Sequence, residues 1–520
     1  NVKATMQELY DGLEARGQNA WPSVRFDLGA VNNLLGRFLA AGFYYKTFMG
    51  IPPLEWGSGT GMWMRYERLI RRAAGMGEAS RLPDPDHYEH AHAFCDVLVV
   101  GAGPAGIAAA GAAAESGLDV VLVEQDNLLG GAQLSTPCGG SESIPSVQEL
   151  ESSGVRVMTR TTAFGLYDYN VAGLVERVTD HLPDPPGYLP RQRFWTLRTK
   201  YTIVAAGAIE RHIAFGNNDR PGVMTAAAAR TYLNRFAVLP GENIIIATNN
   251  DSAYEGAVEL SSAGAKVTLL DARSAISDEH MQQLTERNIE VRCGTAPLQV
   301  LGSGNIAALE IARADGTGWR AASTESCDLV LVSGGWSPVV NLLSHRGVKP
   351  VWDSTQACFL AVECAEPISV AGSAAGVWNS ADCVASGQVA AGDALQVLRG
   401  QMNKITRPPV GGWQQPIRAL YEVKVPGRKL KSFIDPQHDV TTEDVRLAHR
   451  EGFVSVEHLK RYTTLGMATD QGKMGNIIGL ALMAEALGKE ISEVGTTTFR
   501  PPYTPVSIGA LRGRSVGRHF

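Results

Sequence analysis

The sequence predicts an α/β fold with two Rossmann-like domains and a small C-terminal helical module. Two strand–turn–helix–strand patterns predict the two domains: the first strand lies at residues 96–100 and the equivalent strand of the second pattern at residues 243–247. This unit builds doubly wound parallel sheets. Short helices with recognisable caps near the C-terminus predict the module. A chain of 520 residues is long enough to bury several such cores.

The first turn carries the glycine pattern of a dinucleotide site. Gly101, Gly103 and Gly106 follow the apolar strand 96–100. In this pattern the first glycine permits the tight turn, the second lets the backbone approach a pyrophosphate, and the third lets the helix pack close to the strand. Glu124 ends the next strand, where a carboxylate can accept a hydrogen bond from a ribose hydroxyl. The alternative is a glycine-rich turn that only packs, but the complete context favours a dinucleotide site.

The first domain is predicted to span residues 95–235 and 325–400. Alternating segments up to 194–198 predict a small antiparallel meander, and the apolar run 202–206 is expected to return to the sheet. The run 329–333 is also expected to return to this domain.

The last turn of this domain bears on the cofactor. In flavin-binding members of the two-dinucleotide flavoprotein architecture this turn reads Gly-Asp, and the acid supports the ribityl and phosphate region of the flavin. Here Gly372 is followed by Ser373. A dinucleotide other than FAD is therefore plausible, because NAD does not need that carboxylate.

The second Rossmann-like domain, residues 236–324, has a degenerate fingerprint. Thr248, Asn250 and Ala253 stand where glycines are required, and Asp251 adds a charge that would repel a phosphate. We expect this domain to keep its fold and to have lost its nucleotide.

Residues 410–520 are expected to form a small helical module without a metal cluster. Thr441 reads as an N-cap with Asp444 at the third position, and Gly488 can end a later helix. No cysteine follows Cys383, which excludes thiolate ligation of an iron–sulfur cluster in this module.

The loop 463–473 precedes the later helix and combines hydroxyl groups with a lysine. Thr463, Thr464 and Lys473 lie just before a helix N-terminus, where backbone N–H groups and the positive end of the helix dipole favour an anion. The alternative is an irregular polar loop whose residues satisfy one another.

Composition excludes several other classes of protein. A net charge of −6 and a pI near 6.0 argue against a nucleic-acid surface, and no apolar run is long enough for a membrane span. The seven cysteines include no C-x-x-C pair and the histidines show no metal spacing, so neither a metal site nor a dithiol is expected. A reduced, cytoplasmic compartment is the default expectation. Residues 1–94 are rich in aromatic residues and predict a docking arm, or equally a segment that packs on its own domain.

Together these motifs resemble the alpha subunit of heterotetrameric sarcosine oxidase. Besides the fingerprint, the resemblance is carried by residues 43–48, 207–211, 217–224, 248–254, 458–464 and 499–505. It implies that the first domain binds NAD. The implied binding positions are Gly101, Gly103, Ala105, Gly106, Glu124, Gln125, Ala163, Gly372, Ser373, Ala374 and Ala375.

The resemblance also implies the activity of a larger complex. The family oxidises an N-methyl amine such as sarcosine at an FAD in the beta subunit and passes electrons to an FMN at the alpha/beta interface, which reduces O2 to H2O2. The one-carbon unit passes to tetrahydrofolate. Beta, gamma and delta subunits are the implied partners. The family's ferredoxin-like and folate-binding domains are expected to lie outside residues 1–520. Thr463, Thr464 and Lys473 are expected to help hold the FMN phosphate, and no catalytic residue is expected in this chain.

Two other functions remain open. One is a stand-alone FAD/NAD(P)-dependent oxidoreductase, which the degenerate second fingerprint, the missing dithiol and Ser373 disfavour. The other is a non-catalytic scaffold subunit whose bound nucleotide never turns over.

Overall fold

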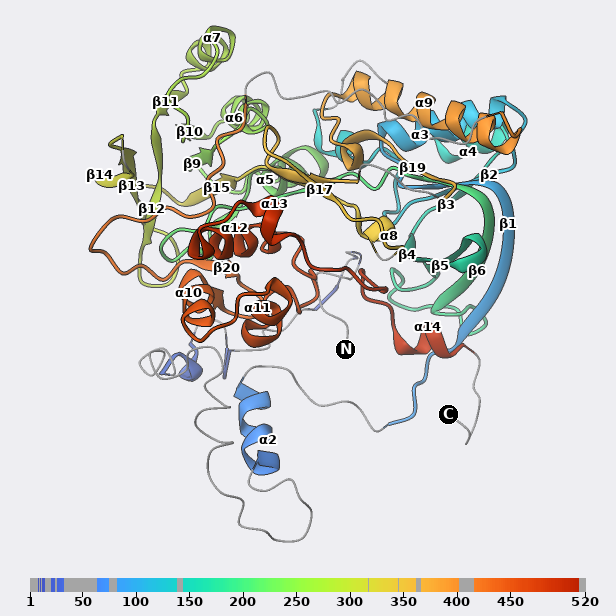
Figure 1. Cartoon of the computed structure of the whole chain (residues 1–520), viewed down its shortest axis with the longest axis horizontal. Coiled ribbons are helices and arrows are strands. Elements are labelled where there is room, and N and C mark those ends of the chain that lie inside the picture. The colour runs from blue at the N-terminus through green and yellow to red at the C-terminus, as the bar shows by residue number, and fades with distance from the viewer. Residues whose placement is uncertain are drawn as a thin grey trace. The chain divides into compact units, whose positions relative to one another are not determined.

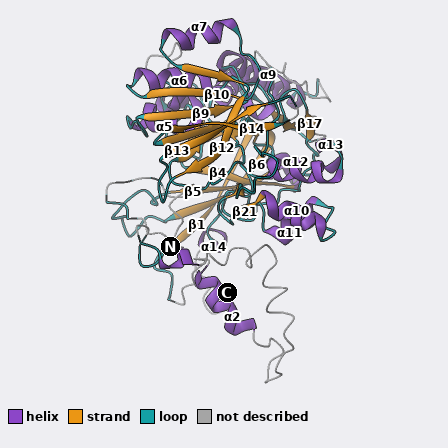
Figure 2. Ribbon diagram, turned by 90° about the vertical axis from the view of Figure 1, so that its left-hand side faces the viewer, coloured by secondary structure: helices purple, strands orange, loops and turns teal. Residues whose placement is uncertain are grey.

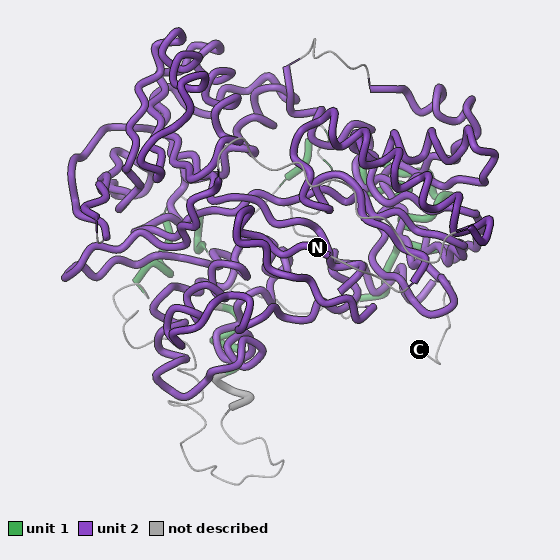
Figure 3. The backbone as a smooth tube through the Cα atoms, turned by 45° about the horizontal axis from the view of Figure 1, so that its top comes forward, with its two compact units in different colours: residues 1–88, 177–192, 514–520 green, residues 89–176, 193–513 purple. Residues whose placement is uncertain are grey.

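The computed structural model describes residues 82–137, 144–316, 318–344, 346–361, 366–401 and 416–513, with helix α2 (Trp63–Ala73) and short pieces within residues 8–31. The chain divides into two compact units (Figure 3), of which the larger comprises residues 89–176 and 193–513. In the smaller unit, Arg191 pairs with Asp86 and Asp180, each at 2.6 Å. Most of the predicted docking arm lies outside the described residues.

The first sheet of the larger unit is mixed, and parallel strands form the half that carries the fingerprint. Its order is β3 (Val155–Met158), β2 (Val120–Val123), β1 (Tyr88–Val100), β6 (Gln192–Val204), β5 (Val171–Arg177) and β4 (Thr161–Tyr167), with β19 (Ile368–Val370) paired to β6. Helices α3 (Pro104–Glu115) and α9 (Ser380–Leu398) lie side by side on this sheet (Figure 1). Their close approach requires small residues, because a Cβ at Gly387 would lie 2.1 Å from the Ala105 carbonyl oxygen.

The second sheet is fully parallel, as the second strand–helix–strand pattern predicts. Its order is β11 (Glu290–Cys293), β10 (Lys266–Asp271), β9 (Asn243–Thr248), β15 (Leu329–Ser333) and β8 (Val223–Thr225). Its helices are α5 (Ala226–Phe236), α6 (Ala253–Ser262) and α7 (Asp278–Glu286). An antiparallel meander follows, formed by β12 (Thr295–Leu301), β13 (Ala308–Ala314) and β14 (Trp319–Ser326).

Three sequence predictions about these sheets were wrong. The run 329–333 forms β15, which pairs with β9 and β8 in the second sheet and does not return to the first. Helix α5 lies within the predicted span 95–235 but packs on β8 and β15. The runs 194–198 and 202–206 were read as separate segments, whereas both lie largely in the single strand β6. A continuous apolar run indicates burial, but it does not say which sheet the strand joins.

Short ribbons connect the two sheets. Strands β7 (Ala208–Glu210) and β16 (Trp336–Pro338) pair antiparallel, with Glu210 opposite Trp336. The remaining short elements are η3 (Gly131–Ser135), α4 (Val147–Ser152), η4 (Asp168–Asn170), α8 (Asn341–Ser344), β17 (Val351–Asp353), β18 (Cys358–Leu360) and η5 (Gly372–Ala375).

The C-terminal module contains short helices around a small core, as predicted. Its elements are β20 (Phe433–Asp435), β21 (Val440–Thr441), α10 (Thr442–Arg450), α11 (Val456–Thr463), α12 (Asn476–Leu487), α13 (Ile491–Val494) and α14 (Ile508–Arg512). Figure 2 shows α10 to α13 gathered beside the sheets. Both predicted caps are confirmed: Thr441 and Asp444 form a reciprocal capping box, and Gly488 ends α12 in the left-handed conformation.

Candidate dinucleotide site

The three fingerprint glycines differ in what their surroundings permit. Gly101 has φ +100°, and a Cβ there would lie 2.4 Å from the Ala205 carbonyl oxygen. A Cβ at Gly106 would lie 1.8 Å from the carbonyl oxygen of Gly101. Gly103 has an ordinary φ of −75°, and a Cβ there would have nothing within 4 Å. Packing therefore requires the first and third glycines, whereas the space in front of the second is open.

This open space lies at the N-terminus of α3. Gly103 is the N-cap of that helix, and no side chain caps it. The first backbone N–H groups of an α-helix have no partner within the helix, and together with the helix dipole they favour an anion. The open cradle at Gly103 therefore fits a pyrophosphate.

Glu124 is held beside this cradle. Its two carboxylate oxygens accept hydrogen bonds from the backbone N–H groups of Ala102 at 2.7 Å and Asp126 at 2.9 Å. Only 8% of Glu124 is exposed, and this burial raises the pKa of its carboxyl group. A carboxylate oxygen has two lone pairs, so each oxygen can accept one further bond from a ribose hydroxyl.

Two more segments complete the site. Thr161 N–H donates to the Glu124 carbonyl oxygen at 2.7 Å, which places the start of β4 beside Glu124; Ala163 is the third residue of this strand. A Cβ at Gly372 would lie 2.7 Å from the Cβ of Ala105, so η5 abuts the start of α3. Gln125 follows Glu124 and is exposed. The predicted NAD-binding residues thus come together from the fingerprint turn, the end of β2, β4 and η5.

Ser373, the residue that distinguishes this turn from the flavin-binding pattern, makes a weak local contact. Its hydroxyl lies 3.9 Å from the thiol of Cys383. Cys383 is buried, and burial raises the pKa of its thiol, so the group stays protonated. The turn therefore presents a small neutral hydroxyl where an acid would support a flavin.

Side chains of the second domain fill the corresponding slot there. Asp271, the last residue of β10, corresponds to Glu124, which directly follows β2, and it is fully buried. Its carboxylate accepts from the Tyr254 hydroxyl at 2.5 Å and from the Arg273 guanidinium at 2.9 Å. Burial is the main cause that raises the pKa of Tyr254, and the negative charge of Asp271 raises it further. Asp251, expected to repel a phosphate, instead pairs with Arg273 at 2.7 Å. Tyr254 and Arg273 therefore take the hydrogen-bonding positions on Asp271 that a ribose would use.

The loop 463–473 divides into two parts. The Thr463 hydroxyl donates to the Leu459 carbonyl oxygen at 2.8 Å, and the Thr464 hydroxyl donates to the Thr463 carbonyl oxygen at 2.5 Å. Both threonine hydroxyls are therefore already hydrogen-bonded to nearby backbone carbonyl oxygens. The Lys473 ammonium lies 4.5 Å from the ring centroid of Tyr503, and burial lowers the pKa of the lysine. The structure does not bring the threonine hydroxyls to the cavity that Lys473 lines.

That cavity, of about 40 Å³, contains groups that the sequence analysis missed. Asn476 lines it, and the Asn476 amide nitrogen is buried with no hydrogen-bond partner among the described residues. Phe499 and Tyr503 form an edge-to-face pair in its wall. Phe499 and Tyr503 belong to the run 499–505, which carries the family resemblance, but no local sequence signal places them beside Lys473.

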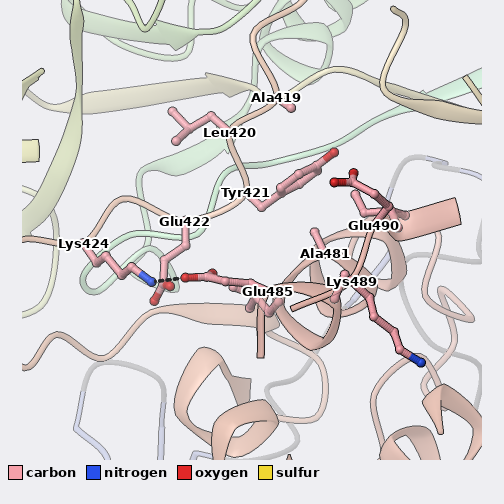
Figure 4. Close-up of a pocket in the computed structure, with 12 residues that line it drawn as sticks. Ala419, Leu420, Tyr421, Glu422, Lys424, Ala481, Glu485, Lys489 and Glu490 are labelled. Atoms are coloured by element: carbon pink, nitrogen blue, oxygen red, sulfur yellow. Dashed lines mark hydrogen bonds and ion pairs between the residues drawn. The ribbon is translucent and has the colours of Figure 1, made fainter. Parts of the chain in front are cut away.

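A larger cleft of about 350 Å³ lies between residues 419–424 and helices α12 and α13 (Figure 4). Lys424 and Glu485 form an ion pair at 2.5 Å across it. None of the predicted site residues lines this cleft.

Within the described ranges, no cluster of three or more His, Cys, Asp or Glu side chains has the arrangement of a metal site. None of the helices described there is both long and apolar enough to cross a membrane.

Comparison with known proteins gives two family matches. Residues 95–384 match the pyridine nucleotide-disulphide oxidoreductase model, and residues 429–514 match the sarcosine oxidase A3 domain model. The chain is 44% identical, over its whole length and 52% of the relative, to sarcosine oxidase subunit alpha from Rhizobium meliloti (strain 1021). It is 36% identical, over 85% of the chain and 48% of the relative, to the subunit of the same name from Corynebacterium sp. (strain U-96).

The chain thus spans about half the length of the curated relatives it matches. Among solved structures, L-proline dehydrogenase from P. horikoshii aligns with a TM-score of 0.60 and 21% identity, covering 82% of this chain and 80% of that one. This similarity confirms the predicted fold class.

Proposed function

Because this chain belongs to the pyridine nucleotide-disulphide oxidoreductase family and is a homologue of sarcosine oxidase alpha subunits, we propose that it is the NAD-binding subunit of a multi-subunit sarcosine oxidase. The observation that carries the proposal is the contrast between the two turns. The space at Gly103 is open at a helix N-terminus, whereas Tyr254 and Arg273 fill the equivalent slot of the second domain. One dinucleotide per chain follows.

NAD, when bound, supplies a nicotinamide that can accept a hydride, and the residues of this chain bind and orient it. Gly103 and the first N–H groups of α3 would hold the pyrophosphate, and Glu124 would accept a hydrogen bond from the adenosine ribose. Gly372 packs against Ala105, and we propose that Ala105, Gly106 and the turn Gly372–Ala375 would line the site behind the dinucleotide. The neutral Ser373 supports NAD over FAD.

The FMN of the complex is proposed to lie at the interface between this chain and the beta subunit. Lys473 is the residue that supports this part, because it lines a cavity together with Asn476, whose amide nitrogen has no hydrogen-bond partner among the described residues. Both groups donate hydrogen bonds, and a phosphate accepts them. Thr463 and Thr464 would act indirectly, by shaping the turn.

The remaining components are proposed from the resemblance to the alpha subunit of heterotetrameric sarcosine oxidase. An FAD in the beta subunit oxidises sarcosine to glycine, O2 is reduced to H2O2, and a folate-binding domain outside residues 1–520 passes the one-carbon unit to tetrahydrofolate. Gamma and delta subunits complete the complex, which is proposed to be cytoplasmic. The docking arm at residues 1–94 is proposed to contact a partner subunit.

Co-expression of the full-length protein with its candidate partners tests the proposal. The purified complex is expected to consume O2 and release H2O2 when sarcosine is added, and the alpha chain alone is expected to do neither. Sarcosine oxidation by the alpha chain alone would contradict the proposal, because it would place the amine-oxidising flavin in this chain.

A further inference from the structure

Two half-buried tryptophans lie beside the last turn of the candidate dinucleotide site. Trp378 follows η5 by three residues, and Trp336 begins β16, which packs against η5. Their ring centroids are 6.5 Å apart and the ring planes meet at 44°, so the indoles do not stack on each other. Aromatic faces of this kind are suited to a planar heterocycle.

Both indoles are fixed in place by hydrogen bonds. The indole N–H of Trp336 donates to the Ser252 hydroxyl at 2.9 Å, and that of Trp378 donates to the Gln356 side-chain oxygen at 2.8 Å. The buried Arg211 donates to the backbone carbonyl of Trp336 at 2.6 Å. A ligand that meets a fixed aromatic surface loses little free energy to side-chain ordering.

The partner of Trp336 comes from the degenerate turn of the second domain. Ser252 donates its hydroxyl to the side-chain oxygen of Asn250 at 2.6 Å. Asn250 is completely buried and donates in turn to the Ser333 hydroxyl at 3.2 Å. Asn250, which stands in place of a glycine, therefore supports the Trp336 indole through Ser252.

The open part of the site continues toward this pair. Gly101 lies against Ala205, and Gly207 follows Ala205 by two residues. As at Gly103, a Cβ added at Gly207, which has φ +73°, would have nothing within 4 Å. Strand β7 then runs to Glu210, which pairs with Trp336. Strand β16, which Trp336 begins, packs against η5, and η5 abuts the start of α3 at Ala105. The two tryptophans therefore lie beside the turn that borders the predicted dinucleotide site.

We propose that Trp336 and Trp378 form an aromatic wall that contacts the nicotinamide ring of bound NAD, with Ser252 and Asn250 as positioning residues for Trp336. The inference rests on the proposed binding of NAD to the first domain. In this arrangement, side chains of the degenerate turn in the second domain help to position the ligand of the first domain.

Nucleotide exchange in the purified full-length complex tests this inference. Bound nucleotide is exchanged by equilibrium dialysis against labelled NAD or labelled ADP-ribose, which lacks the nicotinamide ring. We expect Trp336→Leu and Trp378→Leu each to weaken NAD binding by about 2- to 10-fold and to leave ADP-ribose binding unchanged. Trp336→Phe should recover most of the loss, and Ser252→Ala should cause a smaller loss for NAD alone.

Trp195→Leu is the matched control, because Trp195 lies on β6 and donates its indole N–H to Glu176 at 2.8 Å, outside the site. It should change neither affinity. Equal losses for NAD and ADP-ribose, or no loss in any variant, would overturn the aromatic wall while leaving NAD binding intact. If the unmodified complex binds neither nucleotide, both the wall and the proposed function are wrong.

Discussion

Substitutions at Gly103 and Gly106 should affect the protein differently: a side chain at Gly103 should keep the fold and remove the nucleotide, whereas one at Gly106 should lower stability. A Cβ at Gly103 would have nothing within 4 Å, and the residue has an ordinary backbone conformation, so Gly103→Ala is free of strain. Restricting the unfolded chain would stabilise the protein by about 0.4–1 kcal/mol, but alanine is less favourable than glycine at an N-cap, so Gly103→Ala should leave stability nearly unchanged. The larger Gly103→Val should keep the fold but place its methyl groups in the pyrophosphate cradle, and the chain should then lose its NAD.

Gly106→Ala is the matched comparison. Its Cβ would lie 1.8 Å from the carbonyl oxygen of Gly101, so the fingerprint turn and α3 must move apart. Overpacking of this kind costs about 1–3 kcal/mol or more. Urea unfolding midpoints and the NAD content after gel filtration give both quantities for each variant. A Gly103→Val protein that retains a full equivalent of NAD would refute the assignment of this space to the pyrophosphate.

Three further predictions follow from buried or enclosed groups. In the co-expressed complex, Lys473→Met should weaken FMN phosphate binding by about 1–3 kcal/mol, and an assembled complex with full FMN content would show that the loop is only structural. Tyr254→Phe should destabilise the fold by about 1–3 kcal/mol, because it removes the hydroxyl that donates a hydrogen bond to Asp271 at 2.5 Å. The NAD content should not change, and a loss of NAD would contradict the assignment of NAD to the first domain. Burial raises the pKa of Glu210 from 4.5 to about 7. Between these pH values Glu210 keeps its proton in the folded protein and loses it in the unfolded chain. The free energy of unfolding should therefore fall by about 3 kcal/mol as the pH rises from 4.5 to 7. Glu210→Gln should remove this fall while keeping the bond from Ala227 N–H, and an unchanged pH profile would argue against it.

Local patterns predicted much of this fold. The fingerprint, the acid at the end of the second strand and the cap at Thr441 each depend on residues close in sequence, and the structure places them as expected. The assignment of β15 failed because its apolar residues would be buried in either sheet, and only the pairing with β9 and β8 decides between them.

The candidate site was predictable where a motif defines it and unpredictable where distant side chains meet. The sequence indicated that the second turn had lost its glycines, but not that Tyr254 and Arg273, 19 residues apart, would close the slot around Asp271. Lys473 was found from its position before α12, whereas its neighbour Tyr503 lies on a different segment. The contacts of Trp336 with Ser252 likewise join residues 84 positions apart.

The most direct test of the account is the identity and amount of nucleotide bound by the purified chain. Acid extraction followed by chromatography separates NAD from FAD and quantifies each against protein. We expect one NAD per chain and no FAD, because the first turn is open, Ser373 replaces the acid that supports a flavin, and the second slot is filled. FAD in a one-to-one ratio with this chain would contradict it.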